Sequence, residues 1–265
     1  MSSPTRLDLT GLRQRQLTLL DRLDELCRRE GLTYYLWGGT LLGALKFGGY
    51  IPWDDDLDVT MPREDYERLL ALPDERLPSG TTLLSTRRSA DYHLPYTKLG
   101  LLGTLLVDHG SHLDLPVNID VHPLDDDSSA PGGRLRRRVQ WLVLQGLSSS
   151  MGPLGSGWRR PVRRLARQLV RGVSRHRLSA TVDRLAARRT PGSPHVSVAV
   201  WHNRAEMRRE WFGTPVDIDY EGRRCLSPQH PREVLAALYG PDWTEMPPDE
   251  QQVTHHDFEA FELTD

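Results

Sequence analysis

Hydrophobic positions at the start of the chain recur with a helical period. Over Thr10–Glu30 the leucines are spaced at close to 3.6 residues, which predicts an amphipathic helix, and Gly31 supplies its end. The aromatic and aliphatic run at 32–37 that follows predicts a short strand. The chain therefore begins with a helix followed by a strand.

Glycine pairs divide the next hydrophobic stretches. The Gly38-Gly39 pair interrupts the strand, and Thr40 is in a position to cap a brief helix over 41–46. A second glycine pair ends that helix, and the chain then runs into another predicted strand at 56–60. A strand, a glycine turn and a helix in this order direct backbone N–H groups toward one point, which suits a phosphate.

The remaining pattern contains both kinds of element. Pro62 is expected to open a helix over 63–72, and another helix at 232–239 follows Pro231. An acidic stretch rich in serine and glycine at 125–133 predicts a loop. Further strands are predicted at 81–85, 96–99, 104–107, 117–121 and 196–201, and basic helices at 134–148 and 158–189. Because some strands are too close together for helical crossovers, we expect an α/β (α+β) fold with a mixed sheet flanked by helices.

Composition narrows the class of protein. Of the 265 residues, 38% are hydrophobic and 26% are charged, and the mean hydropathy is −0.52, which is typical of a soluble globular chain. Cys27 and Cys225 are too few for a disulfide framework or a zinc knuckle. No run approaches the roughly 18 apolar residues of a membrane span, and no signal-peptide pattern is visible. We expect a cytoplasmic protein.

Basic residues are unevenly distributed, although the net charge is only −2. Lysine occurs only at positions 46 and 98, and residues 131–190 hold 15 arginines and one acid. This segment has three interpretations, in descending order: a solvated helical face, a surface for an anionic substrate, and a contact with an anionic membrane. No reading motif accompanies the charge, so we expect no nucleic-acid partner.

Acidic residues gather where the strand at 56–60 begins. Asp56 and Asp58 stand at i and i+2 on that predicted strand, so their side chains share one face, and Asp54 adds further negative charge. Adjacent carboxylates repel each other, and a divalent cation such as Mg²⁺ removes this cost. The alternative is a solvated acidic turn after Pro52.

Other candidates are single residues. Asp120 lies between aliphatic residues on a predicted strand, where the alternative is an ordinary exposed aspartate. Lys46 and Lys98 are candidate phosphate-binding charges, with surface lysines as the alternative. Trp53 is interpreted as a core residue rather than a base-stacking platform. The histidines, including His122, lack metal-binding spacing, and most of them are interpreted as ordinary surface or loop residues.

Several motifs together resemble the LicD family. The stretch GTLLGALKFGGYIPWDDDLDVTMPREDY at 39–66 is similar to the family signature, and NIDVHPLD at 118–125 resembles its I-D-I-F-P-L-D motif. The Y-T-K at 96–98 and the closing W-F-G, Y-E-G and Y-G-P-D-W motifs agree as well. The family comprises phosphocholine transferases of bacterial cell-surface glycans, and its animal relatives transfer ribitol phosphate from a CDP donor. The resemblance covers roughly 10–125 and 205–256.

The resemblance implies a nucleotidyltransferase-like fold and assigns roles to residues. It implies Asp56, Asp58 and Asp120 as metal ligands and catalytic acids, with Mg²⁺ as the cofactor and Mn²⁺ as the alternative. The candidate residues for the substrate or nucleotide are Gly38, Gly39, Thr40, Lys46, Asp54, Lys98 and His255. We expect a catalytic core at 1–130, an arginine-rich helical insertion at 131–190, and a return to the catalytic domain at 191–265.

The implied reaction is transfer of a substituted phosphate, such as phosphocholine, from a CDP-linked donor to a hydroxyl of a glycan, lipid or small natural product. Gly100, Leu101 and Gly103 depart from the family pattern. This departure leaves a second functional hypothesis open, in which the protein is an NTP-dependent nucleotidyltransferase or kinase that acts on a small metabolite or natural product. A catalytically inactive nucleotide-binding module is a third reading, but it would be expected to lack one of the acids.

Overall fold

The computed structural model describes residues 4–109, 113–127, 131–151, 160–188, 190, 193–200, 205–248, 250, 252–254 and 258–263. The helices are α1 (Leu9–Glu30), α2 (Gly38–Phe47), α3 (Arg63–Ala71), α4 (Pro131–Met151), α5 (Arg160–Leu169), α6 (Arg175–Ala186) and α7 (Pro231–Tyr239), with 3₁₀ turns at Asp74–Arg76 and Arg209–Trp211. The strands are β1 (Thr5–Leu7), β2 (Tyr35–Leu36), β3 (Asp58–Pro62), β4 (Thr81–Leu84), β5 (Thr97–Leu101), β6 (Thr104–Asp108), β7 (Leu113–Leu115), β8 (Asn118–Asp127), β9 (His195–Ser197), β10 (Met207–Arg208), β11 (Val216–Tyr220), β12 (Arg223–Ser227) and β13 (Phe258–Glu262).

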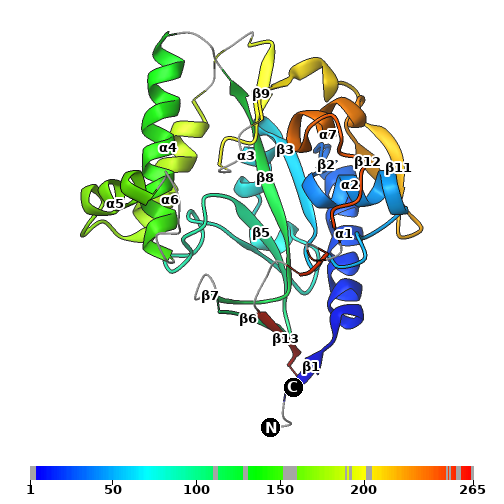
Figure 1. Ribbon diagram of the computed structural model, residues 1–265. Coiled ribbons are helices and arrows are strands. Elements are labelled where there is room, and N and C mark those ends of the chain that lie inside the picture. The colour runs from blue at the N-terminus through cyan, green and yellow to red at the C-terminus, as the bar shows by residue number, and fades with distance from the viewer. Residues whose placement is uncertain are drawn as a thin grey trace.

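The long strand β8 organises the main sheet (Figure 1). Along one side it pairs with β3, the only parallel partner among the described strands. Along its other side, the first half pairs with β5 and the second half with β9, both antiparallel. The expected mixed sheet in an α+β fold is therefore confirmed.

Two smaller sheets complete the described part of the fold. One has the order β1-β13-β6-β7 and joins strands from the two ends of the chain, which lie together at the bottom of Figure 1. The other is the hairpin β11-β12, which lies against α2 and β2. The sequence did not predict β1, β7 or β10 to β13, because most positions in these strands are not buried and so give no strong hydrophobic pattern.

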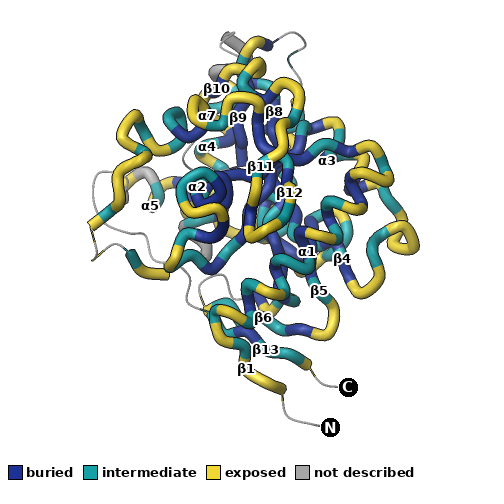
Figure 2. Tube along the Cα trace, turned by 90° about the vertical axis from the view of Figure 1, so that its right-hand side faces the viewer, coloured by how far each residue is buried: buried dark blue, intermediate teal, exposed yellow. Residues whose placement is uncertain are grey.

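The hydrophobic core lies between α1 and the main sheet. The leucines that predicted α1 face this core, and Leu19, Leu23 and Leu26 have no exposed surface. Val59 and Met61 of β3 are also fully buried, as are Ile119 and Val121 of β8. Figure 2 shows the same arrangement as a dark centre beneath exposed outer turns. This burial anchors the two strands on which the main acidic candidates lie.

Several predicted local features were wrong. The helix expected at 158–189 is divided into α5 and α6, and residues 170–174 between them are not helical. Helix α2 begins at Gly38 with Trp37 as its N-cap, so Thr40 is inside the helix and does not cap it. Strand β3 begins at Asp58, so Asp56 lies in the loop before the strand rather than on it. The predicted loop at 125–133 was wrong as well, because β8 continues to Asp127 and α4 begins at Pro131.

Helices α4, α5 and α6 pack on one another beside the main sheet (Figure 1). Gly146 of α4 allows the close approach of α5, because a Cβ there would lie 2.8 Å from Cγ1 of Val170. Gln140 of α4 donates to the carbonyl oxygens of Val182 and Ala199. Among the described helices, none is both long enough and apolar enough to cross a membrane.

Candidate active site

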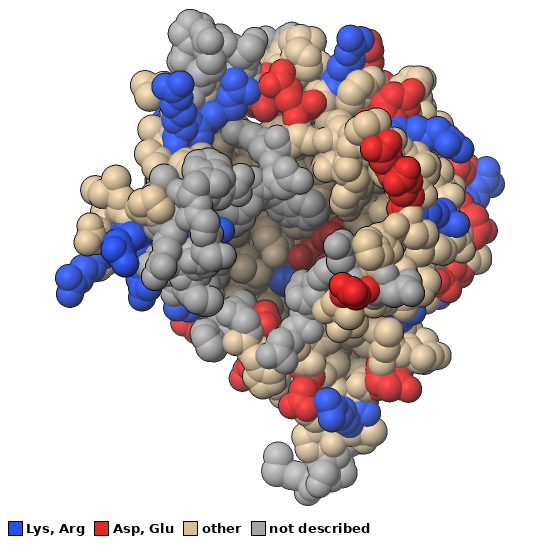
Figure 3. Space-filling view, viewed as in Figure 1, with Lys and Arg blue, Asp and Glu red and all other residues tan. Residues whose placement is uncertain are grey.

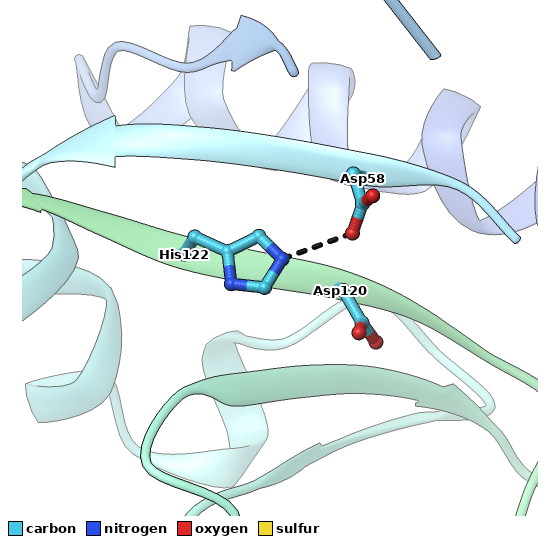
Figure 4. A group of neighbouring side chains, drawn as sticks. All are labelled: Asp58, Asp120 and His122. Carbon is cyan, nitrogen blue, oxygen red and sulfur yellow. Dashed lines mark hydrogen bonds and ion pairs between the residues drawn. The ribbon is translucent and has the colours of Figure 1, made fainter. Parts of the chain in front are cut away.

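Parallel pairing of β3 and β8 brings two distant acids together. Asp58 is directly opposite Asp120 in the register of these strands, although 62 positions separate them in the sequence. Both side chains project from the same side of the sheet, as Figure 4 shows. The sheet therefore creates the juxtaposition of carboxylates that the sequence motifs only suggested.

His122 joins this pair, which corrects its interpretation as an ordinary surface or loop residue. It lies two positions after Asp120 on β8, is only 1% exposed, and its Nε2 is 2.9 Å from Oδ1 of Asp58 (Figure 4). One ligand atom from each of Asp58, Asp120 and His122 can be chosen so that all three lie within 4.8 Å of one another. The ring of Tyr96 lies against the imidazole, with 4.5 Å between centroids. The i, i+2 spacing from Asp120 was the signal that could have identified His122.

Asp54 and Asp56 approach the same site from the loop before β3. Removal from water raises the pKa of Asp56 well above its ordinary value, and repulsion from Asp58, Asp54 and Asp120 adds to this effect. Burial also raises the pKa of Asp54. Four carboxylates thus lie close enough to oppose one another's ionisation, and a divalent cation with oxygen ligands would relieve this repulsion.

Helix α2 holds the acidic loop in place. The hydroxyl of Thr40 accepts a hydrogen bond of 2.9 Å from the backbone N–H of Asp58, so Thr40 positions the start of β3. At Gly39 a Cβ would lie 2.8 Å from Oδ2 of Asp54, and glycine therefore allows the carboxylate to approach the helix. Gly38 has a φ of +56°, which favours glycine at the first position of α2.

The two lysines lie in different surroundings. Lys98 on β5 forms an ion pair with Asp120 and donates to Oδ1 of Asn118 at 2.9 Å, so it belongs to the acidic site. Lys46 is at the end of α2 and donates to the carbonyl oxygen of Glu245 at 3.0 Å. His255, the remaining candidate, lies outside the described residues.

Two cavities meet at Asp56. One of about 160 Å³ is lined by Asp56, Asp120, Lys98 and Tyr96 among others. The second cavity has a volume of about 660 Å³ and also contains Asp56 in its lining. Its lining includes the acids Asp54, Asp56 and Asp58, the base Lys46, and the aromatic residues Phe47, Trp53, Tyr239 and Trp243. In Figure 3 the centre of the viewed face is hollowed, with acidic and basic side chains at the bottom.

Trp53 lines the cavity of about 660 Å³ and is only partly buried, so its interpretation as a core residue was wrong.

A further cavity of about 880 Å³ lies near the other end of β3, against Pro62, Arg208 and Arg209. None of Asp54, Asp56, Asp58 and Asp120 lines that cavity. We therefore place the candidate active site at the cavities of about 160 Å³ and 660 Å³, which the acidic residues line.

Gly100 shows how the chain accommodates one departure from the expected pattern. It is buried on β5, and a Cβ there would lie 2.5 Å from Cγ of Pro116. The proline ring occupies the space into which a side chain at position 100 would project. A large side chain at this position would therefore require the β7–β8 turn to move.

Comparisons with known proteins agree with this site. Residues 31–92 match the nucleotidyltransferase domain described as LicD/FKTN/FKRP, and this match includes the loop with Asp54, Asp56 and Asp58. Over this stretch the chain is similar to the LicD family. Over 268 aligned residues it is 26% identical to the lipopolysaccharide cholinephosphotransferase LicD of Haemophilus influenzae, and the alignment covers 95% of this chain and 98% of that protein.

A shorter similarity, 43% identity over 47 residues, relates 18% of this chain to 18% of an uncharacterized protein of Rickettsia prowazekii. The LicD resemblance seen in the sequence is confirmed, and with it the expectation of a LicD-like transferase. Lys98 and Asp120 lie beyond the matched domain at 31–92, so their place in the site rests on the strand register and contacts described above.

Proposed function

We propose that this LicD-like enzyme transfers a substituted phosphate of the phosphocholine type from a CDP-linked donor to a hydroxyl group of a glycan or lipid acceptor. The similarity to the Haemophilus relative, a lipopolysaccharide cholinephosphotransferase, supports the group transferred and the kind of acceptor. The observation that carries the proposal is the convergence of Asp56, Asp58 and Asp120 beside two cavities. A cytoplasmic location is part of the same proposal.

The acidic residues fit a magnesium ion. Asp56, Asp58 and Asp120 would supply carboxylate oxygens, which Mg²⁺ prefers. Burial and, after it, repulsion from the neighbouring carboxylates raise the pKa of Asp56, and a cation would offset both effects. When bound, the ion would neutralise phosphate charge and polarise the phosphorus that is attacked. His122 holds Oδ1 of Asp58 through its Nε2 and so orients this carboxylate.

The chain's own residues position the two substrates. The larger cavity, with Trp53, Tyr239 and Trp243 in its lining, suits the nucleoside of the donor, because aromatic faces can stack on a base. Lys46 lines this cavity and offers a positive charge to the donor phosphates. The smaller cavity suits the attacking hydroxyl group. Asp120 lines it and is the candidate for accepting the hydroxyl proton.

Phosphorus NMR of the purified protein tests this assignment. The protein is incubated with Mg²⁺ and, in separate samples, CDP-choline, CTP or ATP, each with lipid-linked and soluble glycan acceptors. Release of CMP from CDP-choline, dependent on both Mg²⁺ and an acceptor, is the expected result. Release of pyrophosphate or a nucleoside diphosphate from CTP or ATP would instead indicate the nucleotidyltransferase or kinase alternative.

A binding measurement separates these enzymes from an inactive module. Titration calorimetry with Mg²⁺ and CDP-choline should detect binding by the unmodified protein. The D56N/D58N double variant should bind both more weakly. The matched control is Asp74→Asn, because the Asp74 side chain is 82% exposed and lines neither cavity. Absence of nucleotide binding by the unmodified protein would contradict the proposed function.

A further inference from the structure

Helices α4 and α5 expose apolar side chains that the core does not use. Leu169 is 70% exposed and Leu135 is 65% exposed, the two highest values among the large apolar residues of the described chain. On α5, Leu165 and Leu169 are four positions apart and so lie on one face of the helix. On α4, Leu135, Val139 and Leu142 follow the same helical spacing. Such a surface usually marks a contact with another apolar phase or partner.

The same two helices carry exposed arginines on the parts of their surface that the leucines do not occupy. One exposed arginine, Arg138, lies on α4. Three more are exposed on α5 or just after it: Arg164, Arg167 and Arg171. At the left edge of Figure 3, where α4 and α5 lie in Figure 1, basic side chains stand beside uncharged ones. The segment 131–190 contains 15 arginines. The surface therefore combines positive charge with exposed leucine.

The same helices offer almost no negative charge to offset these arginines. Asp183 is the only acid in 131–190, and it is buried. Its carboxylate accepts hydrogen bonds from Arg63 at 2.7 Å and from Arg87 at 3.0 Å, so it is directed toward the core. The exposed arginines of α4 and α5 therefore require an anionic partner from outside these helices if they are to be neutralised.

We infer that this face of α4 and α5 binds the surface of an anionic phospholipid bilayer. Arginine beside exposed leucine is the combination that places a helix in a membrane interface, where leucine enters the acyl boundary and arginine meets lipid phosphate. A soluble anionic glycan would satisfy the arginines but would leave the leucines in water. A second copy of this chain would cover the leucines but would bring arginine against arginine. The bilayer satisfies both features.

The position of this surface suits a transferase whose acceptor is held at a membrane. Helix α6 packs on α4 and also contacts the segment before β5, where Nδ1 of His176 lies 2.9 Å from the carbonyl oxygen of Tyr92. Four residues later, Tyr96 lies against His122 in the acidic site. The bilayer-binding face and the acidic site are therefore linked through packed elements.

Vesicle flotation tests the inference without nucleotide, Mg²⁺ or catalysis, so its outcome is independent of the proposed function. The full-length protein should float with vesicles of phosphatidylcholine that contain phosphatidylglycerol, and much less with phosphatidylcholine alone. We expect R164Q/R167Q to bind the anionic vesicles about 30-fold more weakly, since each basic residue near such a surface contributes about fivefold. We expect L165Q/L169Q to bind at least about 10-fold more weakly.

Matched variants control for surface changes elsewhere. Leu102→Gln replaces a leucine that is 56% exposed, close to the 55% of Leu165, but lies on the β5–β6 turn. R28Q/R224Q removes two exposed arginines from α1 and β12. Both controls should bind vesicles as the unmodified protein does, and circular dichroism should show all variants folded.

Three results would overturn the inference. The first is a protein that does not float with anionic vesicles. The second is undiminished binding by L165Q/L169Q alongside loss in R164Q/R167Q, which would indicate a charge-only surface for an anionic glycan. The third is a concentration-dependent dimer in analytical ultracentrifugation that L165Q/L169Q abolishes, without any vesicle binding, which would assign the face to a second copy.

Discussion

The acidic site and the arginine-rich helices differ in how closely they hold side chains of like charge and in how far they expose them to water. At the site, β3, β8 and the loop before β3 hold Asp54, Asp56, Asp58 and Asp120 together. Burial, and then repulsion from the other three carboxylates, raises the pKa of Asp56. On α4 and α5 the arginines are spread over an exposed surface, where water screens them. Charges that a sheet forces together away from water require a counter-ion, whereas charges spread over a helix can remain solvated.

Arg63 links strand β8 to helix α6, which packs on α4. It lies at the start of α3 and donates from Nε to Asp125 of β8 at 2.6 Å and from one Nη to Asp183 of α6 at 2.7 Å. Burial alone would lower the pKa of the guanidinium, but Asp125 and Asp183 outweigh this effect and hold it above its ordinary value. This buried network attaches the helices to the sheet that builds the site.

Removal of the Arg63 side chain should cause the largest loss of stability. Arg63→Ala leaves the buried carboxylates of Asp125 and Asp183 without their shared partner, and we expect the free energy of unfolding to fall by about 3–5 kcal/mol. Urea denaturation monitored by circular dichroism measures the change. In the control Arg28→Ala, the exposed pair with Asp24 is lost, which should cost less than about 1 kcal/mol. Equal losses in the two variants would contradict the proposed role of the network.

Removing one charge from the acidic site should abolish most activity while the fold survives. We expect Asp58→Asn to lower kcat at least about 10²–10³-fold, by analogy with the loss of one electrostatic stabiliser. The backbone N–H of residue 58 can still donate to Thr40 in this variant. The measurements are CMP release and a thermal melt, with Asp74→Asn as the control. Near-normal turnover in Asp58→Asn would reject the assignment of this residue.

His122 tests how far the site depends on orientation as well as charge. His122→Phe removes the contact between Nε2 and Asp58, and we expect Mg²⁺ to bind at least about 10-fold more weakly. Titration calorimetry measures this affinity directly. His122→Gln keeps a polar group that can reach Asp58, so it should recover part of the loss. If both variants bind Mg²⁺ as the unmodified protein does, His122 is only a packing residue.

The smallest effect on stability is expected on the arginine-rich surface. Leu169→Gln should change the free energy of unfolding by less than about 0.5 kcal/mol, because this leucine is already mostly in water. In contrast, Leu23→Ala in the core of α1 should cost about 2–5 kcal/mol. Urea denaturation compares the two. A large loss in Leu169→Gln would show that this leucine supports the fold instead of facing a partner.

Local sequence patterns correctly predicted the helices and strands that are specified by their own residues and not by pairing with a distant segment. Helix α1 was predicted to within one residue because its leucines repeat regularly and Gly31 ends it with a φ of +61°. Strand β4 and helix α7 were also close to the predicted ranges. Strand β1 was missed because its partner is β13, at the other end of the chain, and no short-range pattern records such pairing.

The wrong prediction of a loop at the end of β8 has an electrostatic cause. Three successive acids at 125–127 are typical of a solvated loop, yet here they extend β8. An arginine neutralises each of them: Arg63 pairs with Asp125, Arg209 with Asp126, and Arg137 with Asp127. Arg63 and Arg209 are 62 and 83 positions away from their partners, and even Arg137 is 10 positions away, so the composition of the acidic stretch itself could not reveal these pairs.

The sequence by itself determined the amphipathic helix, the mixture of strands and helices, the concentration of arginine in one segment, and the motifs that resemble those of the LicD family. Only the tertiary structure decided that Asp58 stands opposite Asp120, that His122 binds Asp58, and that the leucines of α4 and α5 remain exposed. The physical reason is that periodicity and composition act between neighbours along the chain. Strand register and helix packing instead depend on contacts between segments that are far apart in sequence.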